Sequence, residues 1–228
     1  MKAGLMAMVL ASVAAFGQAA NAPSPAGEPM RVYTNPELHL TFSYPAELTP
    51  RDTATALGAE RRMVYGTDAA TEGDHSKPDT CAKVLLAVAE DSAGSGTGTQ
   101  ASIALFDVNT QCYPAKVLRD KKAMDLLLRN MTIQATTQMG LMPIEQPMFY
   151  DLEGHRMHFC AAQGTPVTTG DLQSGEAEVI GAAAVAVEGH VFGWVLEAND
   201  PTLFNRLMGS QVDLGGGKAQ RLFPTRVQ

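Results

Sequence analysis

The chain has 228 residues, of which 45% are hydrophobic and 18% charged, a composition typical of a globular protein and unlike that of a disordered one. Its formal net charge of −7 argues against nucleic acid or an anionic lipid surface as a partner, because both attract basic proteins. After the N-terminal region, no stretch of eighteen residues is apolar throughout, so the sequence predicts no membrane span there.

The first residues resemble a secretory signal peptide. Lys2 provides a positive charge, and Leu5 to Phe16 form an apolar run of twelve residues. Twelve residues at about 1.5 Å each are too few to cross a hydrocarbon core of about 30 Å. The small residues Gly17 and Ala19 favour cleavage after Ala19. We therefore expect a secreted or periplasmic protein, with no membrane insertion after cleavage.

The rest of the sequence divides into a linker and one folded unit. We expect residues 1–19 to be the signal peptide, 20–29 to be a linker rich in Pro and Ala, and 30–228 to form a single α+β domain. Cleavage would remove Lys2 and leave 16 basic against 24 acidic residues, a net charge of about −8.

The first part of the domain predicts two strands, a helix and a loop. A strand is expected around Arg31 to Tyr33, and Asn35 to Glu37 form a turn with a capping residue. Leu38 to Tyr44 alternate apolar and polar side chains, as a half-buried strand does. A short helix over Asp52 to Met63 and an acidic loop over Thr71 to Thr80 follow.

Two apolar runs then predict a β-hairpin closed by a disulfide. Ala82 to Ala89 and Ala101 to Val108 flank the glycine-rich residues 94–98, and Cys81 and Cys112 lie just outside the runs. In an oxidising compartment these two cysteines are expected to pair, leaving Cys160 free. The alternative is two unpaired buried thiols.

Direct opposition of the two cysteines would fix the register of this hairpin. It would place Val88 opposite Leu105 and Leu85 opposite Val108. Both faces of the hairpin are apolar, so we expect it to be covered on both sides.

The second half predicts a helix, two hairpins and a final helix. Apolar residues recur at three- and four-residue steps from Lys116 to Met139, which indicates one long amphipathic helix. Hairpin turns are expected at Glu153-Gly154 and Glu188-Gly189. Asp200-Pro201 predicts the start of a helix ending near Met208, and the glycine-rich tail after it is expected to be loosely held.

Few residues of the sequence are candidates for a metal-binding or catalytic site. His155 and His158 point to opposite faces of a strand, so they cannot hold one ion together. His158 and Cys160 share a face, which makes them weak candidates for a metal site. We assign no catalytic residue, no cofactor site and no other metal site. The basic run Arg119 to Lys122 is interpreted as a solvated face.

The order of these elements resembles the PsbP-like fold. The resemblance rests on short motifs: Leu40 to Pro45, Glu153 to His155, Glu188 to His190, Val191 to Ala198 and the helix from Asp200. This α/β/α sandwich is shared by a thylakoid extrinsic subunit of the oxygen-evolving complex and a nuclear Ran-binding family. The resemblance implies a mainly antiparallel sheet with helices on both faces, and more often a binding or assembly scaffold than an enzyme. No catalytic residue can be matched.

The sequence therefore predicts an exported, non-enzymatic binding or assembly protein. Its partner would be an envelope protein or a small ligand and not nucleic acid. The alternatives are a hydrolase whose site is assembled only in three dimensions, and a metal or redox protein that uses His158 and Cys160.

Overall fold

A computed structural model describes most of the expected domain. The described residues are 29–53, 63, 81–91, 99–137, 140–165 and 178–223. The following expected features lie outside these residues: the signal peptide, nearly all of the linker, most of the helix ending at Met63, the acidic loop and the glycine-rich hairpin turn. Among the described residues, no helix is long and apolar enough to span a membrane.

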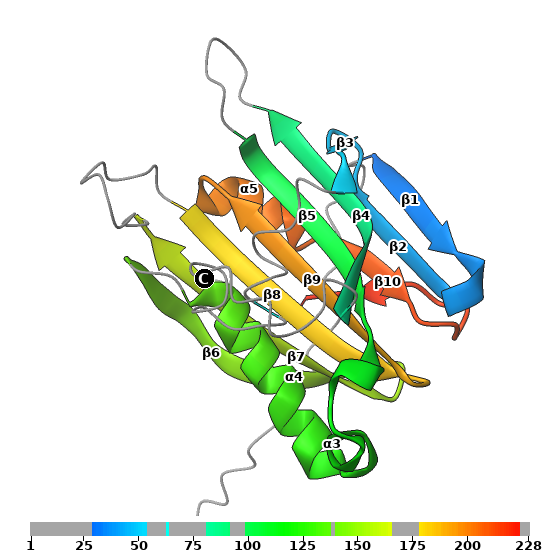
Figure 1. Cartoon of the computed structure of the whole chain (residues 1–228). Helices are drawn as coiled ribbons and strands as arrows, with labels where there is room; N and C mark the ends of the chain where they lie inside the picture. The colour runs from blue at the N-terminus through cyan, green and yellow to red at the C-terminus, as the bar shows by residue number, and fades with distance from the viewer. Residues whose placement is uncertain are drawn as a thin grey trace, which may run out of the picture.

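The centre of the structure is a seven-stranded antiparallel sheet (Figure 1). Its strand order is β3-β4-β5-β9-β8-β7-β6, so three consecutive hairpins supply six of its strands. The bounds are β3 Thr49–Pro50, β4 Ala82–Asp91, β5 Thr99–Val108, β6 Leu141–Leu152, β7 His155–Gly164, β8 Glu178–Val187 and β9 His190–Ala198.

A second sheet of four strands covers one face of the first (Figure 1). Its order is β1-β2-β10-β11, with bounds β1 Met30–Asn35, β2 Leu40–Pro45, β10 Gln211–Asp213 and β11 Gln220–Arg221. Helix α5 (Pro201–Leu207), capped by the Asp200 carboxylate, packs beside it. The α+β class with a mainly antiparallel sheet is therefore confirmed. The expected helical layer on this face is occupied mainly by the second sheet.

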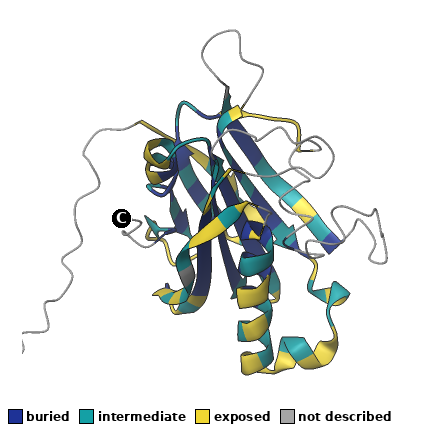
Figure 2. Cartoon of the chain, turned by 90° about the vertical axis from the view of Figure 1, so that its left-hand side faces the viewer, coloured by how far each residue is buried: buried dark blue, intermediate teal, exposed yellow. Residues whose placement is uncertain are grey.

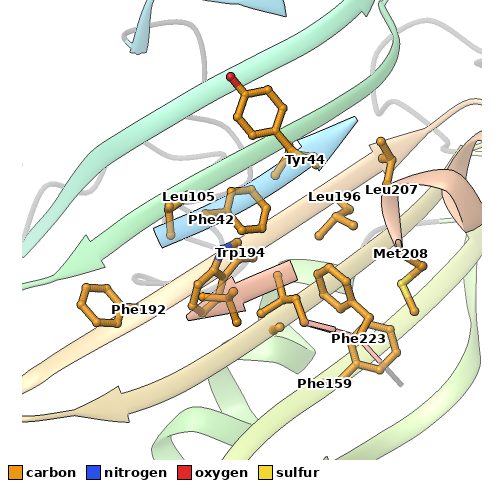
Figure 3. Packing of buried hydrophobic residues seen from close by; sticks show 14 of the residues in the cluster. Phe42, Tyr44, Leu105, Phe159, Phe192, Trp194, Leu196, Leu207, Met208 and Phe223 are labelled. Atoms are coloured by element: carbon orange, nitrogen blue, oxygen red, sulfur yellow. The ribbon is translucent and has the colours of Figure 1, made fainter. Parts of the chain in front are cut away.

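The core between the two sheets, here called the inter-sheet core, is rich in aromatic side chains (Figure 3). The Phe42 ring centroid lies 6.3 Å from that of Trp194, and Phe159 contacts Phe223 edge to face at 5.5 Å. Each fully buried side chain of this size contributes about 1.5–3 kcal/mol. Because Phe223 belongs to this core, the expectation of a loosely held tail was wrong up to that residue. Its segment is further fixed by the Tyr150 hydroxyl, which donates a hydrogen bond to the Leu222 carbonyl.

The opposite face of the large sheet is covered by helix α4 (Lys121–Thr136). Figure 2 shows its buried side turned to the sheet and its exposed side turned to solvent. Leu128, Met131 and Ala135 pack here against small residues of β8 such as Ala182 and Ala184, forming what we call the helix-side core.

The helix expected from Lys116 to Met139 is in fact two helices. The first, α3, spans Ala115–Arg119, and Asp120 leaves the helical conformation before α4 begins. The Asp120 carboxylate accepts a hydrogen bond from the Lys122 backbone N–H at 2.9 Å, so it caps the second helix. The apolar periodicity did not reveal this interruption, because an N-cap residue leaves the later pattern intact.

Two-residue turns fix the registers of the last two hairpins. Glu153-Gly154 and Glu188-Gly189 all have positive φ angles, between 47° and 89°. This is the backbone form that matches the twist of the flanking strands, and glycine adopts it without strain. Both turns lie where the sequence predicts them.

Cys81 and Cys112 form a disulfide, with Cα atoms 5.7 Å apart, but not through the register that the sequence suggested. Val88 pairs with Ile103, and Val108 pairs with Ala82. The pairing register shifts between Val84 and Leu86, because Leu85 has no pairing partner on β5.

Cys112 lies beyond the strand, in the 3₁₀ turn η4 (Thr110–Cys112). The last ladder contact is the Asn109 N–H donating to the Cys81 carbonyl at 2.8 Å. The turn then folds Cys112 back onto Cys81. Equal distances from the hairpin centre therefore do not imply direct opposition.

Replacing both half-cystines, as in Cys81→Ala with Cys112→Ala, should lower the free energy of unfolding by about 3–4 kcal/mol, because the disulfide closes a loop with a sequence separation of 31. Urea titration followed by circular dichroism would measure the loss. A reductant should shift the wild type to the same midpoint and leave the variant unchanged. Equal midpoints for oxidised wild type and variant would contradict the prediction.

Candidate functional site

A cleft of about 510 Å³ opens at one end of the large sheet. Three parts of the chain enclose it: the elbow between α3 and α4, the β6–β7 turn and the β8–β9 turn. The lining residues are Thr110, Leu118, Arg119, Lys121, Met124, Asp125, Leu128, Asp151, Gly154, His155, Arg156, Ala186, Val187, Glu188, Gly189 and His190. The volume is within the range of small-molecule sites.

Asp125 of α4 connects one wall of the cleft to the sheet. Its carboxylate accepts hydrogen bonds from His158 Nε2 at 3.0 Å and from Arg156 at 2.7 Å. Partial burial raises the pKa of Asp125, but the two donors outweigh burial and hold the pKa below its usual range. Asp125 is therefore an anion at neutral pH, fixed by two partners.

An exposed aromatic ring outside the cleft lining contacts Arg156 of this wall. The Arg156 guanidinium lies over the Phe149 ring, 4.3 Å from its centroid, in a cation–π contact. The Phe149 side chain remains exposed, and its ring also approaches His158. Arg156 is thus oriented by Asp125 on one side and by Phe149 on the other.

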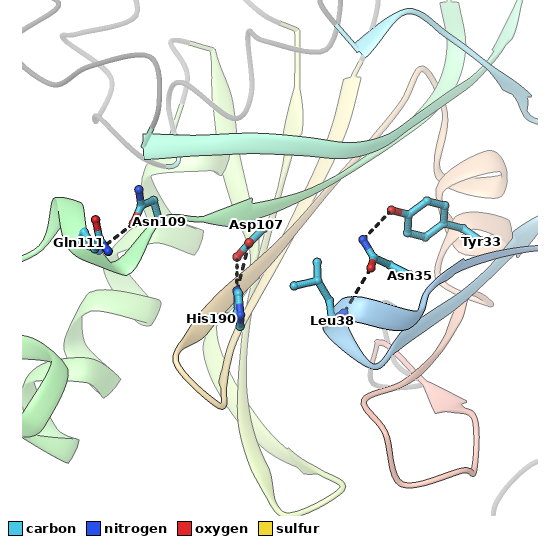
Figure 4. A network of polar contacts seen from close by, with 7 residues as sticks. All are labelled: Tyr33, Asn35, Leu38, Asp107, Asn109, Gln111 and His190. Atoms are coloured by element: carbon cyan, nitrogen blue, oxygen red, sulfur yellow. Dashed lines mark hydrogen bonds and ion pairs between the residues drawn. The ribbon is translucent and has the colours of Figure 1, made fainter.

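His190, which also lines the cleft, forms a second His–Asp pair with Asp107 (Figure 4). His190 Nδ1 lies 3.1 Å from Asp107, and the His190 ring stacks on Phe192 with centroids 5.8 Å apart. Burial raises the pKa of Asp107 above its ordinary value, although His190 and Lys83 act in the opposite direction. The surroundings of Asp107 therefore disfavour the charged form of its carboxyl group.

Arg119 and Lys121 form the basic rim of the cleft. Both are exposed, and no ion pair involves either of them within the described part of the chain. The sequence reading placed them on a solvated face. They are indeed solvated, but the elbow at Asp120 brings them to a cleft that the sequence did not reveal.

The weak metal candidates His158 and Cys160 are both buried beneath α4. His158 is bound to Asp125, whereas the Cys160 sulfur accepts a hydrogen bond from the Thr136 hydroxyl at 3.3 Å. No group of three metal-ligating side chains exists among the described residues. The two residues therefore anchor α4 to β7, and neither lines the cleft.

Cys160 has the properties of a structural thiol. Burial raises its pKa, and the hydrogen bonds from Thr136 and the Ala161 backbone only partly oppose this. Since the thiolate is the nucleophile, a raised pKa lowers reactivity. Within the described ranges, no hydrogen bond joins a Ser, Thr or Cys side chain to a histidine.

Asp125→Ala should lower the free energy of unfolding by about 1–3 kcal/mol at pH 7, because it leaves the buried His158 without its partner. Arg156→Ala removes only an exposed partner of Asp125 and should cost less than about 1 kcal/mol. Denaturant titrations of both variants would measure the difference.

The cost of Asp125→Ala should also depend on pH. The folded-state pKa of Asp125 is lowered, so its contribution is complete above the unfolded value near 3.9 and disappears as the pH falls through the folded value. Equal costs for Asp125→Ala and Arg156→Ala, or a pH-independent difference from wild type, would contradict this account.

Asp107→Asn should behave in the opposite way. Because the folded-state pKa of Asp107 is raised, the wild type loses stability relative to the variant as the pH rises through that pKa. We expect the variant to be at least as stable as the wild type at pH 7, while an amide oxygen can still accept from His190. Thermal melts between pH 4 and 8 test this, and a less stable variant at neutral pH would refute it.

Comparison with known proteins gives structural neighbours only. No protein-family model matches the chain, and no curated protein matches it in sequence. Cyanobacterial PsbP (CyanoP) from Synechocystis is 9% identical, with a TM-score of 0.41 over 78% of this chain and 85% of that one.

Two further solved structures match. The Ran-binding protein Mog1p of Saccharomyces cerevisiae is 12% identical, with a TM-score of 0.37 over 75% of this chain and 78% of that one. The protein of unknown function PA94 from Pseudomonas aeruginosa is 12% identical, with a TM-score of 0.34 over 77% and 85%. The chain thus has a low-specificity resemblance to PsbP-like proteins in fold.

Proposed function

We propose that this protein is an exported, non-enzymatic binding or assembly protein whose cleft contacts a small ligand or an envelope protein. The observation that carries the proposal is the cleft itself. Its walls come from three separate segments, and two charged side chains on its rim, Arg119 and Lys121, have no ion-pair partner within the described residues. Unpaired charges beside an apolar surface are typical of a recognition site.

The internal hydrogen bonds of the cleft support binding over catalysis. The His158–Asp125 and His190–Asp107 pairs each use a ring nitrogen to fix a carboxylate. A nucleophilic mechanism needs the other ring nitrogen to contact a nucleophile as well, and within the described residues no Ser, Thr or Cys side chain is hydrogen-bonded to a histidine. The pairs stabilise the walls of the cleft.

Export is supported by two independent features. The N-terminal sequence has the charge, apolar run and small residues of a signal peptide. The Cys81–Cys112 disulfide is of a kind that persists in oxidising compartments.

In the source cell, the mature chain should begin at Ala20 and be recovered from the periplasm or the medium. Intact mass spectrometry would check this, and a cytoplasmic chain that retains residues 1–19 would contradict it.

The binding proposal can be tested by filling the cleft. His155→Trp places a larger side chain in the cleft at a half-buried position of β7, so it should block binding without unfolding the protein. Gln163→Trp is the matched control, since Gln163 lies on the same strand but is exposed and outside the cleft.

Each tagged variant would be recovered from its native envelope and its bound molecules identified by native mass spectrometry and proteomics. A species that co-purifies with wild type and Gln163→Trp should be lost from His155→Trp. The proposal fails if nothing co-purifies or if both variants retain the species equally. Hydrolytic turnover by the wild type that His155→Trp abolishes would favour the hydrolase alternative.

A further inference from the structure

We infer that the cleft takes an organic anion, with its carboxylate, phosphate or sulfonate group held by Arg119 and Lys121 and its apolar body on the floor of the cleft. This inference rests on the proposed binding function and names the chemical class of the ligand. It depends on the distribution of apolar and charged side chains around the cleft.

The most deeply buried lining residues of the cleft, which we call its floor, are apolar. Leu128 and Val187 are 2% and 7% exposed, and Met124, Ala186 and Leu118 are partly buried beside them. Removing an apolar group from water against such a surface is favourable by about 25 cal/mol per Å². An inorganic ion alone would leave this floor unused.

The rim supplies the positive charge. Arg119 ends α3, and Lys121 begins α4 directly after the capping Asp120, so both lie at the elbow. Lysine and arginine bind carboxylate and phosphate oxygens through charge-assisted hydrogen bonds, and Arg does so in a bidentate fork. Neither side chain takes part in an ion pair within the described ranges, so both can turn toward a ligand.

None of the carboxylates of the cleft forms an ion pair with Arg119 or Lys121 within the described residues. Asp125 is bound to Arg156 and His158, and Asp151 accepts a hydrogen bond from the Gly154 N–H at 2.9 Å. Glu188 is exposed at its turn and is the remaining acid on the rim. Arg119 and Lys121 are therefore not paired with any of these acids, and Asp151 and Glu188 are the two lining carboxylates without a cationic partner within the described residues.

The surrounding charge makes this rim distinctive. The chain carries a formal charge of −7, yet four of its basic residues fall between positions 116 and 122, with one acid among them. That acid, Asp120, is used as the cap of α4. A local basic region on an acidic protein attracts small anions, and the rest of the surface repels large polyanions.

The test uses 8-anilinonaphthalene-1-sulfonate, a fluorescent organic anion with an apolar body, as the probe. Lys121→Glu and Arg119→Glu should each raise its dissociation constant about tenfold, since each loses a favourable charge contact and gains a repulsive one. Lys122→Glu and Arg129→Glu are matched controls: they make the same charge change on exposed residues of α4 outside the cleft. Both controls should stay within about twofold of wild type.

Competition distinguishes the sources of the anionic group. Decanoate carries a carboxylate and adenosine monophosphate a phosphate, and at least one of the two should displace the probe. The cationic amphiphile decyltrimethylammonium should require at least about a tenfold higher concentration for the same displacement. Binding to the wild type should also weaken between 50 and 300 mM NaCl, because exposed charge contacts are screened. This last measurement is independent of any variant's folding.

Three results would overturn the inference: no binding of the probe to the wild type, equal effects of Lys121→Glu and Lys122→Glu, or equal displacement by the cationic and anionic amphiphiles. Failure here is distinguishable from failure of the proposed function. If His155→Trp loses its co-purifying species but Lys121→Glu and Arg119→Glu retain it, the cleft binds a partner that is not an anion. If nothing co-purifies at all, the binding function itself fails.

Discussion

The structure depends on small residues in two central strands of the large sheet, which allow close packing on both of its faces. Gly181 of β8 leaves room for the Phe204 ring of α5, since a Cβ there would lie 2.6 Å from it. Gly193 of β9 does the same for Phe106, which is its direct partner on β5. A larger side chain at Gly181 would displace a ring of the covering helix α5, and one at Gly193 would displace the Phe106 ring that packs over it from the neighbouring strand, because packed aromatic rings cannot yield by this amount. The small residues of β8 and β9 thus determine how closely helix, sheet and second sheet approach.

The sequence predicted those elements that depend on interactions between residues close together in the chain. The Glu-Gly turns and the Asp200 cap act over two or three residues, so their sequence signatures are sufficient. The shift at Leu85 and the 3₁₀ turn that folds Cys112 back onto Cys81 leave the pattern of the two apolar runs unchanged, so that pattern did not predict them. Short strands such as β10 are stabilised mainly by their neighbours and leave almost no pattern of their own.

Most of the cleft could not be predicted from the sequence for a similar reason. Its walls meet only because the elbow at Asp120 and two hairpin turns reach the same end of the sheet, which requires the strand order. The sequence pointed to His158 only as a weak metal candidate, and its partner in the structure, Asp125, is on a helix 33 positions away. One signal was available: Asp125 is a charged residue directly after Met124 in the apolar pattern of that helix, and such residues often bind a buried polar group.

The second sheet is built from the two ends of the described chain. Strand β2 pairs on one side with β1 and on the other with β10, so Ser43 is bonded to a strand that begins at Gln211. During synthesis, the Phe42 side of the inter-sheet core therefore stays open until the last residues of the domain have emerged. Pairing over such a sequence distance forms late and slowly. A chain of this topology therefore keeps the inter-sheet core incomplete until β10 and β11 are available.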